Sequence, residues 1–479
     1  MMNLVGDPWI PVLFEDGSHK LVSLQDLFAK GETIRDLSVN PAQRIALMRL
    51  LICIAQAALD GPKNEEDWKT SLLLIAPQSL KYLEANRHSF DLFGDKPFLQ
   101  VSDLMPTLNA SMDKLEFGLA AGNNPKLFDH GACEDGRCHV SAHAALSLLT
   151  FQCFSPGGMI GITSWSGIQT SKNSEHAPCL ESSPLHTILR GGNVVETIWL
   201  NLLSRKQVQE HLAVGMGRPV WEQTYATLSP VPEWTQTYLG RMIPLSRGIL
   251  LDGSLRKCTF VNGFSFAKLP NYREAMLTVT VFEGKKGQEY RYLPLRLERH
   301  PWRELNSVLN LNRKGKSGGP LALEHLCSLE RGTVDIWTGG LAADKGKLLD
   351  MAEWVFSVPA QLLDTGTLEI YGKGVEWARR GEFSLKESVK KFASEMKMAD
   401  SSGLFQWAAA EFWSVLDAQY NQLIEIAQDH AHGLDPWVTT IRRAMYTAYN
   451  QACPSSTPRQ MRAFVAGQSL LHVKEPSHD

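Results

Sequence analysis

Long apolar runs are missing from this sequence of 479 residues, and so is a net charge of either sign. The 48 Lys and Arg residues nearly balance the 51 Asp and Glu residues, and the formal net charge is −3 at pH 7. A protein that holds nucleic acid or anionic lipid by itself usually carries a strong positive field. The near balance excludes such a basic domain, so any nucleic-acid surface must be local or shared with another chain.

Signals for secretion and membrane insertion are also lacking. The N-terminal residues contain no basic cluster followed by an apolar core, and the most apolar stretch, Ile45 to Leu59, includes Arg49 and Gln56. The eight cysteines are scattered instead of forming the spaced pairs of a disulfide framework. We therefore expect buried thiols, a cytoplasmic location and no membrane contact.

Recognisable catalytic motifs are scarce. The segment Gly161 to Gly167 places serines between glycines but does not match the G-x-S-x-G elbow that presents a nucleophile. No dinucleotide-binding turn, phosphate loop or two-carboxylate metal motif occurs. We predict a non-enzymatic chain with no catalytic residues and no cofactor. An unrecognised hydrolase that uses His139 or Ser166 is the alternative.

One short segment concentrates residue types that bind metals. Donors of the kind that tetrahedral zinc takes recur there within fourteen positions: His130, Cys133, Cys138, His139 and His143. The spacing between the two cysteines is wider than the usual pair, and no second pair completes a four-ligand site. We expect polar loop residues and free thiols here, and no metal.

The hydrophobic pattern predicts a large mixed domain at the start of the chain. A β-hairpin turns at Asp16-Gly17, a core helix runs from Pro41 to Leu59, and strand signals dominate from Gly248 to Leu297. Residues 118–167 are rich in Gly, Asn, Pro and Cys around one helical stretch, Val140 to Leu149. Loops of that length in a compact domain usually bind something.

Helical spacing prevails in the last quarter of the sequence. Apolar residues recur at helical intervals in four consecutive segments joined by short connections, which predicts a four-helix bundle: about 383–396, 404–427, 435–452 and 456–473. The predicted fold class is α+β. It comprises a mixed α/β domain over residues 1–370, a glycine-bearing linker at 371–381 and the bundle over 382–479.

Two local groups of basic residues are candidates for contact with phosphate. Residues 285–316 carry nine Lys or Arg against three Glu, a local charge of +6. The second group lies in the predicted bundle: Arg442, Arg443, Arg459 and Arg462. A solvated strand or helix face explains the same residues, and charge alone does not decide between the two interpretations.

Three short motifs occur in a recognisable order. They are Asn3-Leu4 with Trp9-Ile10-Pro11-Val12, then Leu24-Gln25-Asp26-Leu27-Phe28, then Lys96-Pro97-Phe98-Leu99-Gln100. Together with a Pro156-Gly157-Gly158 turn, a Gly339-Gly340 turn and the terminal bundle, they resemble the CasA family, the large subunit of the type I-E CRISPR Cascade surveillance complex. The resemblance covers nearly the whole chain.

The resemblance implies DNA recognition without catalysis. CasA subunits recognise the protospacer-adjacent motif (PAM) in double-stranded DNA, start strand separation for R-loop formation and offer the docking surface for a helicase-nuclease, while guide RNA pairing reads the remaining target. The implied partners are the guide RNA-bearing Cascade subunits, double-stranded target DNA and the helicase-nuclease. A scaffold subunit that has lost motif reading is the alternative within this class.

The motif-reading residues of the family have counterparts here. A glycine loop, whose backbone approaches the minor groove, resembles the segment Gly157, Gly158, Met159, Ile160 and Gly161, although Met159 and Ile160 interrupt its glycines. A lysine that enters the minor groove resembles Lys257. A simple Pro-Gly turn and a surface strand lysine are the alternative interpretations of these two elements.

Two further elements follow from the resemblance. A wedge hairpin, whose tip separates bases beside the motif, resembles Asp344, Lys345 and Gly346 after the Gly339-Gly340 turn. Lys345 stands where the family usually has glutamine, so it can displace a base but cannot make paired amide contacts. A loop that anchors the subunit on its complex resembles a segment of which Phe128 matches best: Lys126, Leu127, Phe128, Asp129 and His130.

Overall fold

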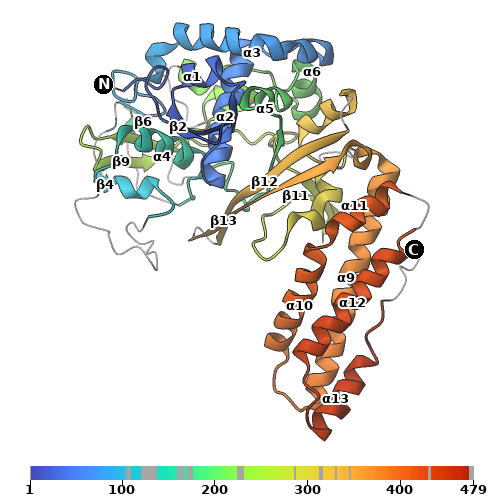
Figure 1. The fold of residues 1–479 in the computed structure, drawn as a ribbon. Coiled ribbons are helices and arrows are strands. Elements are labelled where there is room, and N and C mark those ends of the chain that lie inside the picture. Colours follow the sequence, from blue (N-terminus) through green and yellow to red (C-terminus); the bar gives the residue numbers. More distant parts are fainter. Residues whose placement is uncertain are drawn as a thin grey trace. The chain divides into compact units, whose positions relative to one another are not determined.

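The computed structural model describes residues 2–102, 104, 109–119, 137–158, 164–165, 168–169, 176–223, 231–284, 287–311, 317–329, 332–344, 347–429 and 433–473. The chain divides into two compact units, Met1–Glu298 with Arg313–Ser357, and Arg299–Asn312 with Val358–Asp479. Figure 1 shows helices and strands mixed in the first unit and long helices in the second. The α+β fold class with a C-terminal helical region is confirmed.

The first unit contains helices of very different length. They are α1 (Leu24–Ala29), α2 (Pro41–Ala58), α3 (Glu65–Ala85), α4 (Ser141–Phe154), α5 (Val194–Leu200), α6 (Arg205–Gln207) and α7 (Tyr238–Met242). The predicted core helix is confirmed as α2, which begins at Pro41 after Asn40 and Gln43 form a capping box. Its apolar residues are buried, and it packs against α3, α4, α5 and α7.

A buried ion pair lies within this core. Arg49 of α2 is 1% exposed, and its Nη1 donates to Glu274 Oε2 at 3.0 Å. Its Nε and Nη2 donate to the carbonyl oxygens of Met242 and Arg241 at 2.6 and 2.9 Å. A buried charge is tolerated only when it is paired and hydrogen-bonded, as Arg49 is here.

Small antiparallel sheets supply the β content of the first unit. Their strands are β1 (Ile10–Phe14), β2 (His19–Val22), β3 (Ile34–Leu37), β4 (Asn109–Ser111), β5 (Ser164–Trp165), β6 (Ile168–Gln169), β7 (His186–Arg190), β8 (Arg247–Leu251), β9 (Lys257–Asn262), β10 (Val279–Gly284), β11 (Gly287–Tyr292), β12 (Thr333–Asp344) and β13 (Lys347–Pro359). The three-stranded sheets have the orders β2-β1-β3, β4-β9-β8 and β13-β12-β7. The predicted N-terminal hairpin is confirmed as β1 and β2, with Gly17 at φ +80° in its turn.

The predicted Gly339-Gly340 turn is wrong. Both glycines lie inside β12, where Gly339 pairs with His186 of β7. A Cβ on Gly339 would lie 2.7 Å from the Trp337 ring, and one on Gly340 would lie 2.8 Å from the Pro184 carbonyl oxygen. These glycines therefore permit close packing of a strand and do not form a turn.

The second unit contains the C-terminal helices. They are α8 (Leu305–Val308), α9 (Thr365–Glu395), α10 (Ser402–Asp417), α11 (Tyr420–Gln428), α12 (Asp435–Ala452) and α13 (Pro458–Gln468). The 31-residue α9 packs against α10, α11, α12 and α13. The segment predicted as one helix over 404–427 is divided at Ala418 and Gln419 into α10 and α11.

The predicted linker at 371–381 is also wrong, because these residues lie inside α9. A Cβ on Gly374 would lie 2.2 Å from a methyl carbon of Leu423, and one on Gly381 would lie 2.7 Å from a methyl carbon of Ile441. The glycines let neighbouring helices approach α9. The boundary between the two units falls instead after Ser357.

The described part of the basic stretch 285–316 does not form one face. Arg299 to Asn312 belongs to the second unit, and Arg303 is 4% exposed. The Arg303 guanidinium donates to both carboxylate oxygens of Asp417 at 3.1 Å and lies 3.7 Å from the Trp413 ring centre. Arg303 therefore joins this segment to α10, and it does not contact phosphate.

No helix among the described residues is long and apolar enough to cross a membrane.

We predict that Arg303→Ala destabilises the second unit by about 3–5 kcal/mol, because it removes the guanidinium that donates to both oxygens of the largely buried Asp417 carboxylate. Urea denaturation followed by tryptophan fluorescence measures the effect. Arg442→Ala is the matched control, since Arg442 is exposed on α12, and it should change stability by no more than about 0.5 kcal/mol. Equal effects of the two substitutions would contradict the structural role of Arg303.

Candidate nucleic-acid interface

The Pro156-Gly157-Gly158 segment, the glycine turn, follows α4 and is held by a buried arginine. Arg247, at the start of β8, is 2% exposed. Its Nε donates to Ser155 Oγ at 2.9 Å, its Nη1 donates to the Gly158 carbonyl oxygen at 3.2 Å, and its Nη2 donates to the Pro156 carbonyl oxygen. One guanidinium therefore fixes three parts of the turn.

The same arginine connects the turn to the sheet and to α4. Its Nη1 also donates to Asn262 Oδ1 at 3.2 Å, at the end of β9. Its backbone N–H donates to Gln152 Oε1 at 3.0 Å, and its carbonyl oxygen accepts from Gln152 Nε2 at 2.9 Å. Burial lowers the pKa of Arg247 to about 10, so the side chain remains charged at neutral pH.

Glycine is required at position 158. Gly158 has φ +125°, a conformation that L side chains rarely adopt, and a Cβ placed there would meet nothing within 4 Å. The position is therefore restricted by its backbone conformation and not by its neighbours. Gly157 and Gly158 are described, whereas the predicted loop residues Met159, Ile160 and Gly161 lie outside the described residues.

Lys257 is placed on the same sheet as Arg247. It is the first residue of β9, pairs with Ser111 of β4 and is half-buried. Asn262, which accepts a hydrogen bond from Arg247, is the last residue of β9. Five residue steps along the strand separate the two positions by about 16 Å at the usual rise. The turn and Lys257 are thus held at opposite ends of one strand.

The hairpin predicted as a wedge is formed by β12 and β13. β12 ends at Asp344, which is exposed, and β13 begins at Lys347. The predicted tip residues Lys345 and Gly346 lie outside the described residues. Ser183 Oγ fixes the end of β12, because it donates to the Ala343 carbonyl oxygen at 3.1 Å and accepts from the Ala343 N–H at 2.8 Å.

Two histidines of the metal-type cluster, His139 and His143, are bound to carboxylates. His139 Nε2 lies 2.8 Å from Asp113 Oδ1, and His143 Nε2 lies 3.2 Å from Glu116 Oε2. The hydrogen bond to Glu116 raises the pKa of His143, although partial burial opposes this shift. Cys138 is exposed, whereas Cys133 and the predicted anchoring loop Lys126, Leu127, Phe128, Asp129 and His130 lie outside the described residues.

Comparison with known proteins decides the family. Residues 3–449 match the sequence model of the family described as CRISPR-associated protein Cse1. The chain belongs to the Cse1 family. A CasA/Cse1 protein from Thermus thermophilus is 27% identical over an alignment of 490 positions. The alignment covers 93% of this chain and 91% of that protein.

Solved Cse1 structures share the fold. Thermus thermophilus CasA (Cse1) superposes with a TM-score of 0.79 at 23% identity, covering 98% of this chain and 99% of that one. Thermobifida fusca Cse1 gives 0.80 at 20% identity, covering 98% and 97%. A chain of a structure described as a CRISPR RNA-guided surveillance complex gives 0.80 at 17% identity, covering 98% and 99%.

Some residues that build this candidate interface were not identified from the sequence. Arg247 and Ser183 fix the glycine turn and the β12 end, but both act through partners that are distant along the chain. In the sequence, Arg247 stands out only as a charged residue at the start of the apolar strand that continues to Leu251. Ser183, at φ +48°, carries no sequence signal that separates it from other loop serines.

We predict that Gly158→Ala destabilises the protein by roughly 1–3 kcal/mol, the usual cost of holding a non-glycine residue at an unfavourable positive φ. Urea denaturation of the full chain measures this cost. Gly215→Ala is the matched control, because Gly215 also has open space at its Cβ position but no positive φ. If both variants are equally stable, the conformation of the turn does not require glycine.

Proposed function

We propose that this chain is the non-catalytic large subunit of a type I-E CRISPR Cascade complex, and that it recognises the protospacer-adjacent motif in double-stranded DNA. The observation that carries the proposal is the glycine turn, whose Gly158 has no neighbour at its Cβ position and whose carbonyl oxygens are fixed by Arg247. A rigid backbone without side chains can approach the floor of a groove without a further ordering cost.

The remaining motif-reading elements are assigned in the same way. Lys257 enters the minor groove, where a cation is attracted by the negative potential. The β12–β13 hairpin, with Asp344, Lys345 and Gly346 at its tip, pushes between the bases beside the motif and starts strand separation. The fixed attachment of the β12 end to Ser183 supports this role, because a wedge must be held against the stacked bases.

Membership in a complex accounts for two surface properties. The net charge of −3 gives no overall attraction to the DNA phosphates, so partner subunits that carry the guide RNA supply most of the attraction. The second unit also exposes large apolar side chains, which include Phe383 at 66%, Trp407 at 54% and Val465 at 59%. These side chains are available for contact with partner subunits.

Strand cutting is assigned to a helicase-nuclease that docks on this subunit, not to the chain itself. The proposal therefore gives this chain no reacting group, and its contribution is positioning and strand opening. The scaffold alternative, in which the subunit completes the complex but no longer reads the motif, is supported by Met159, Ile160 and Lys345, which depart from the family pattern.

The test is binding by the reconstituted guide-loaded complex to a library of duplex targets randomised in the flanking positions. Recognition of the motif predicts strong enrichment of a few flanking sequences, and omission of this subunit should abolish the enrichment. The purified chain alone should bind duplex DNA weakly and without preference. Tight target binding without any flanking preference would overturn motif recognition and support the scaffold alternative.

We predict that Lys345→Ala weakens binding of the complex to a fully paired target by roughly 1–3 kcal/mol, the scale of a lost base-edge or unstacking contact. A target with a bubble beside the motif should be spared, because its strands are already separated. Affinity for both targets at two salt concentrations measures the effect, with Lys347→Ala as the control of equal charge. An equal loss on both targets, with the salt slope reduced by about one, would assign Lys345 to phosphate contact.

A further inference from the structure

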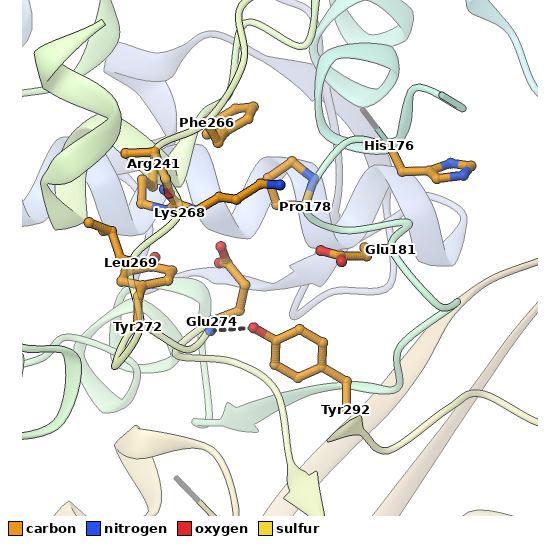
Figure 2. Close-up of a pocket in the computed structure, with 11 residues that line it drawn as sticks. His176, Pro178, Glu181, Arg241, Phe266, Lys268, Leu269, Tyr272, Glu274 and Tyr292 are labelled. Atoms are coloured by element: carbon orange, nitrogen blue, oxygen red, sulfur yellow. Dashed lines mark hydrogen bonds between the residues drawn. The ribbon is translucent and has the colours of Figure 1, made fainter. Parts of the chain in front are cut away.

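A cavity of about 560 Å³ lies beside the glycine turn in the first unit (Figure 2). Its volume is within the range of pockets that bind small organic groups. His176 lines the cavity, and its Nδ1 accepts a hydrogen bond from the Gly157 N–H at 2.9 Å. The cavity and the proposed motif-reading turn therefore share a residue.

One side of the cavity is flat, aromatic and positively charged. The Arg241 guanidinium lies 4.3 Å from the ring centre of Tyr272 and 5.2 Å from that of Phe266. Its Nη1 donates to the carbonyl oxygens of Thr235 at 2.7 Å and Ala267 at 3.1 Å, which fixes its plane. Planar heterocycles stack on aromatic rings and guanidinium planes of this kind.

Glu274, which carries a buried carboxylate oxygen without a partner, lines the same cavity. Glu274 is 5% exposed, and its Oε2 accepts from Arg49, but Oε1 has no hydrogen-bond partner among the described residues. Figure 2 shows the Glu274 carboxylate directed into the space between Lys268 and Tyr292. An unpaired buried acceptor costs folding free energy, so this oxygen marks a place where a ligand N–H would be bound favourably.

A hydrogen-bond donor lies next to this acceptor. The Tyr292 hydroxyl oxygen accepts from the Glu274 N–H at 3.1 Å. Burial raises the pKa of Tyr292 to about 12, so the hydroxyl keeps its proton at neutral pH. Among the described residues, the hydrogen bond of the Tyr292 hydroxyl is the one that it accepts from Glu274, which leaves its proton available to a ligand.

The mouth of the cavity carries an exposed cation. Lys268 makes no hydrogen bond or ion pair within the described part of the chain, and in Figure 2 its side chain extends above the Glu274 carboxylate toward Pro178. A phosphate group attached to a bound heterocycle would meet Lys268 at this point.

We propose that this cavity binds one unpaired nucleobase that carries an exocyclic amine. Glu274 Oε1 accepts from the amine, Tyr292 donates to the adjacent ring nitrogen or carbonyl oxygen, the base stacks on Tyr272 and Phe266, and Lys268 contacts its phosphate. Adenine, cytosine and guanine fit this pattern. Thymine and uracil fit poorly, because their N–H lies between two carbonyl oxygens that the carboxylate would repel.

The inference rests on the proposed function, which brings an opened strand close to the glycine turn. Both the opened target DNA and the unpaired end of a guide RNA offer such a base, and proteins commonly hold bases of this kind by stacking and edge hydrogen bonds. The experiment therefore places its probe in each strand separately.

The probe is 5-iodocytosine, which crosslinks to aromatic side chains on irradiation. It is placed one position at a time in the target strand, the displaced strand or the guide RNA of the reconstituted complex. Mass spectrometry should find the crosslink on Tyr272, Phe266 or Tyr292 from one unpaired position in one strand. Crosslinks only outside the cavity, in a complex that still selects its flanking motif, would overturn the inference and leave the proposed function intact. Loss of motif selection would refute both.

Affinity measurements show whether the crosslinked base is bound in the cavity or only lies near it. An abasic site at the crosslinked position should weaken binding of the wild-type complex about tenfold or more, as expected for a lost stacked base. The Tyr272→Phe complex keeps the ring and should lose the same affinity at an abasic site. The Tyr272→Leu complex should bind the intact strand more weakly, and an abasic site should weaken its binding little further. An equal abasic penalty in all three complexes would overturn the inference.

A second pair of variants changes exposed lysines, so the packing of the core stays intact. Lys268→Gln should weaken binding several-fold and reduce the salt slope by about one. Lys69→Gln removes the same charge from the exposed side of α3 and should change neither quantity. Replacement of the crosslinked cytosine by thymine should also weaken binding by the wild type. If Lys268→Gln behaves as Lys69→Gln does, and thymine binds as well as cytosine, the cavity does not hold this base.

Discussion

The candidate interface depends on the guanidinium of Arg247. This one group is hydrogen-bonded to Ser155, Pro156 and Gly158 of the turn and to Asn262 of β9, so the turn and the sheet move together. The guanidinium charge is buried, and these hydrogen bonds offset the cost of burying it. The glycine turn has little side-chain packing of its own. It is held in place by hydrogen bonds from Arg247, which is itself buried and cannot contact DNA.

Periodic hydrophobic patterns predicted the regular elements well. The N-terminal hairpin, α2 and α12 were expected, because apolar spacing and capping residues are local properties of a sequence. The start of α9 and the division between α10 and α11 were not. Glycines were interpreted less well. Gly339 was assigned to a turn and Gly374 to a linker, but each lies in a regular element. A glycine in a turn and a glycine under a neighbouring side chain look alike until that neighbour, such as Leu423, is known.

The candidate site was only partly predictable for a related reason. Resemblance suggested Gly158 and Lys257, since both occur within short recognisable segments, and their role in DNA contact stays a prediction. Arg247 and Glu274 were not identified, because their importance comes from partners far away in the chain, among them Gly158 and Arg49. Burial and hydrogen bonding at that separation are consequences of the whole fold, and no local pattern encodes them.

The division of the second unit into two stretches constrains how the protein can be made. Arg299–Asn312 leaves the ribosome before the helices that enclose its Trp302 and Arg303, because α9 and α10 are encoded beyond Val358. At ordinary elongation rates the delay lasts for seconds, long enough for an apolar segment to meet other chains. During that time Trp302, Leu305 and Val308, which are fully buried in the finished protein, lack the helices that cover them. A truncation before Val358 would leave that apolar segment permanently without its partners.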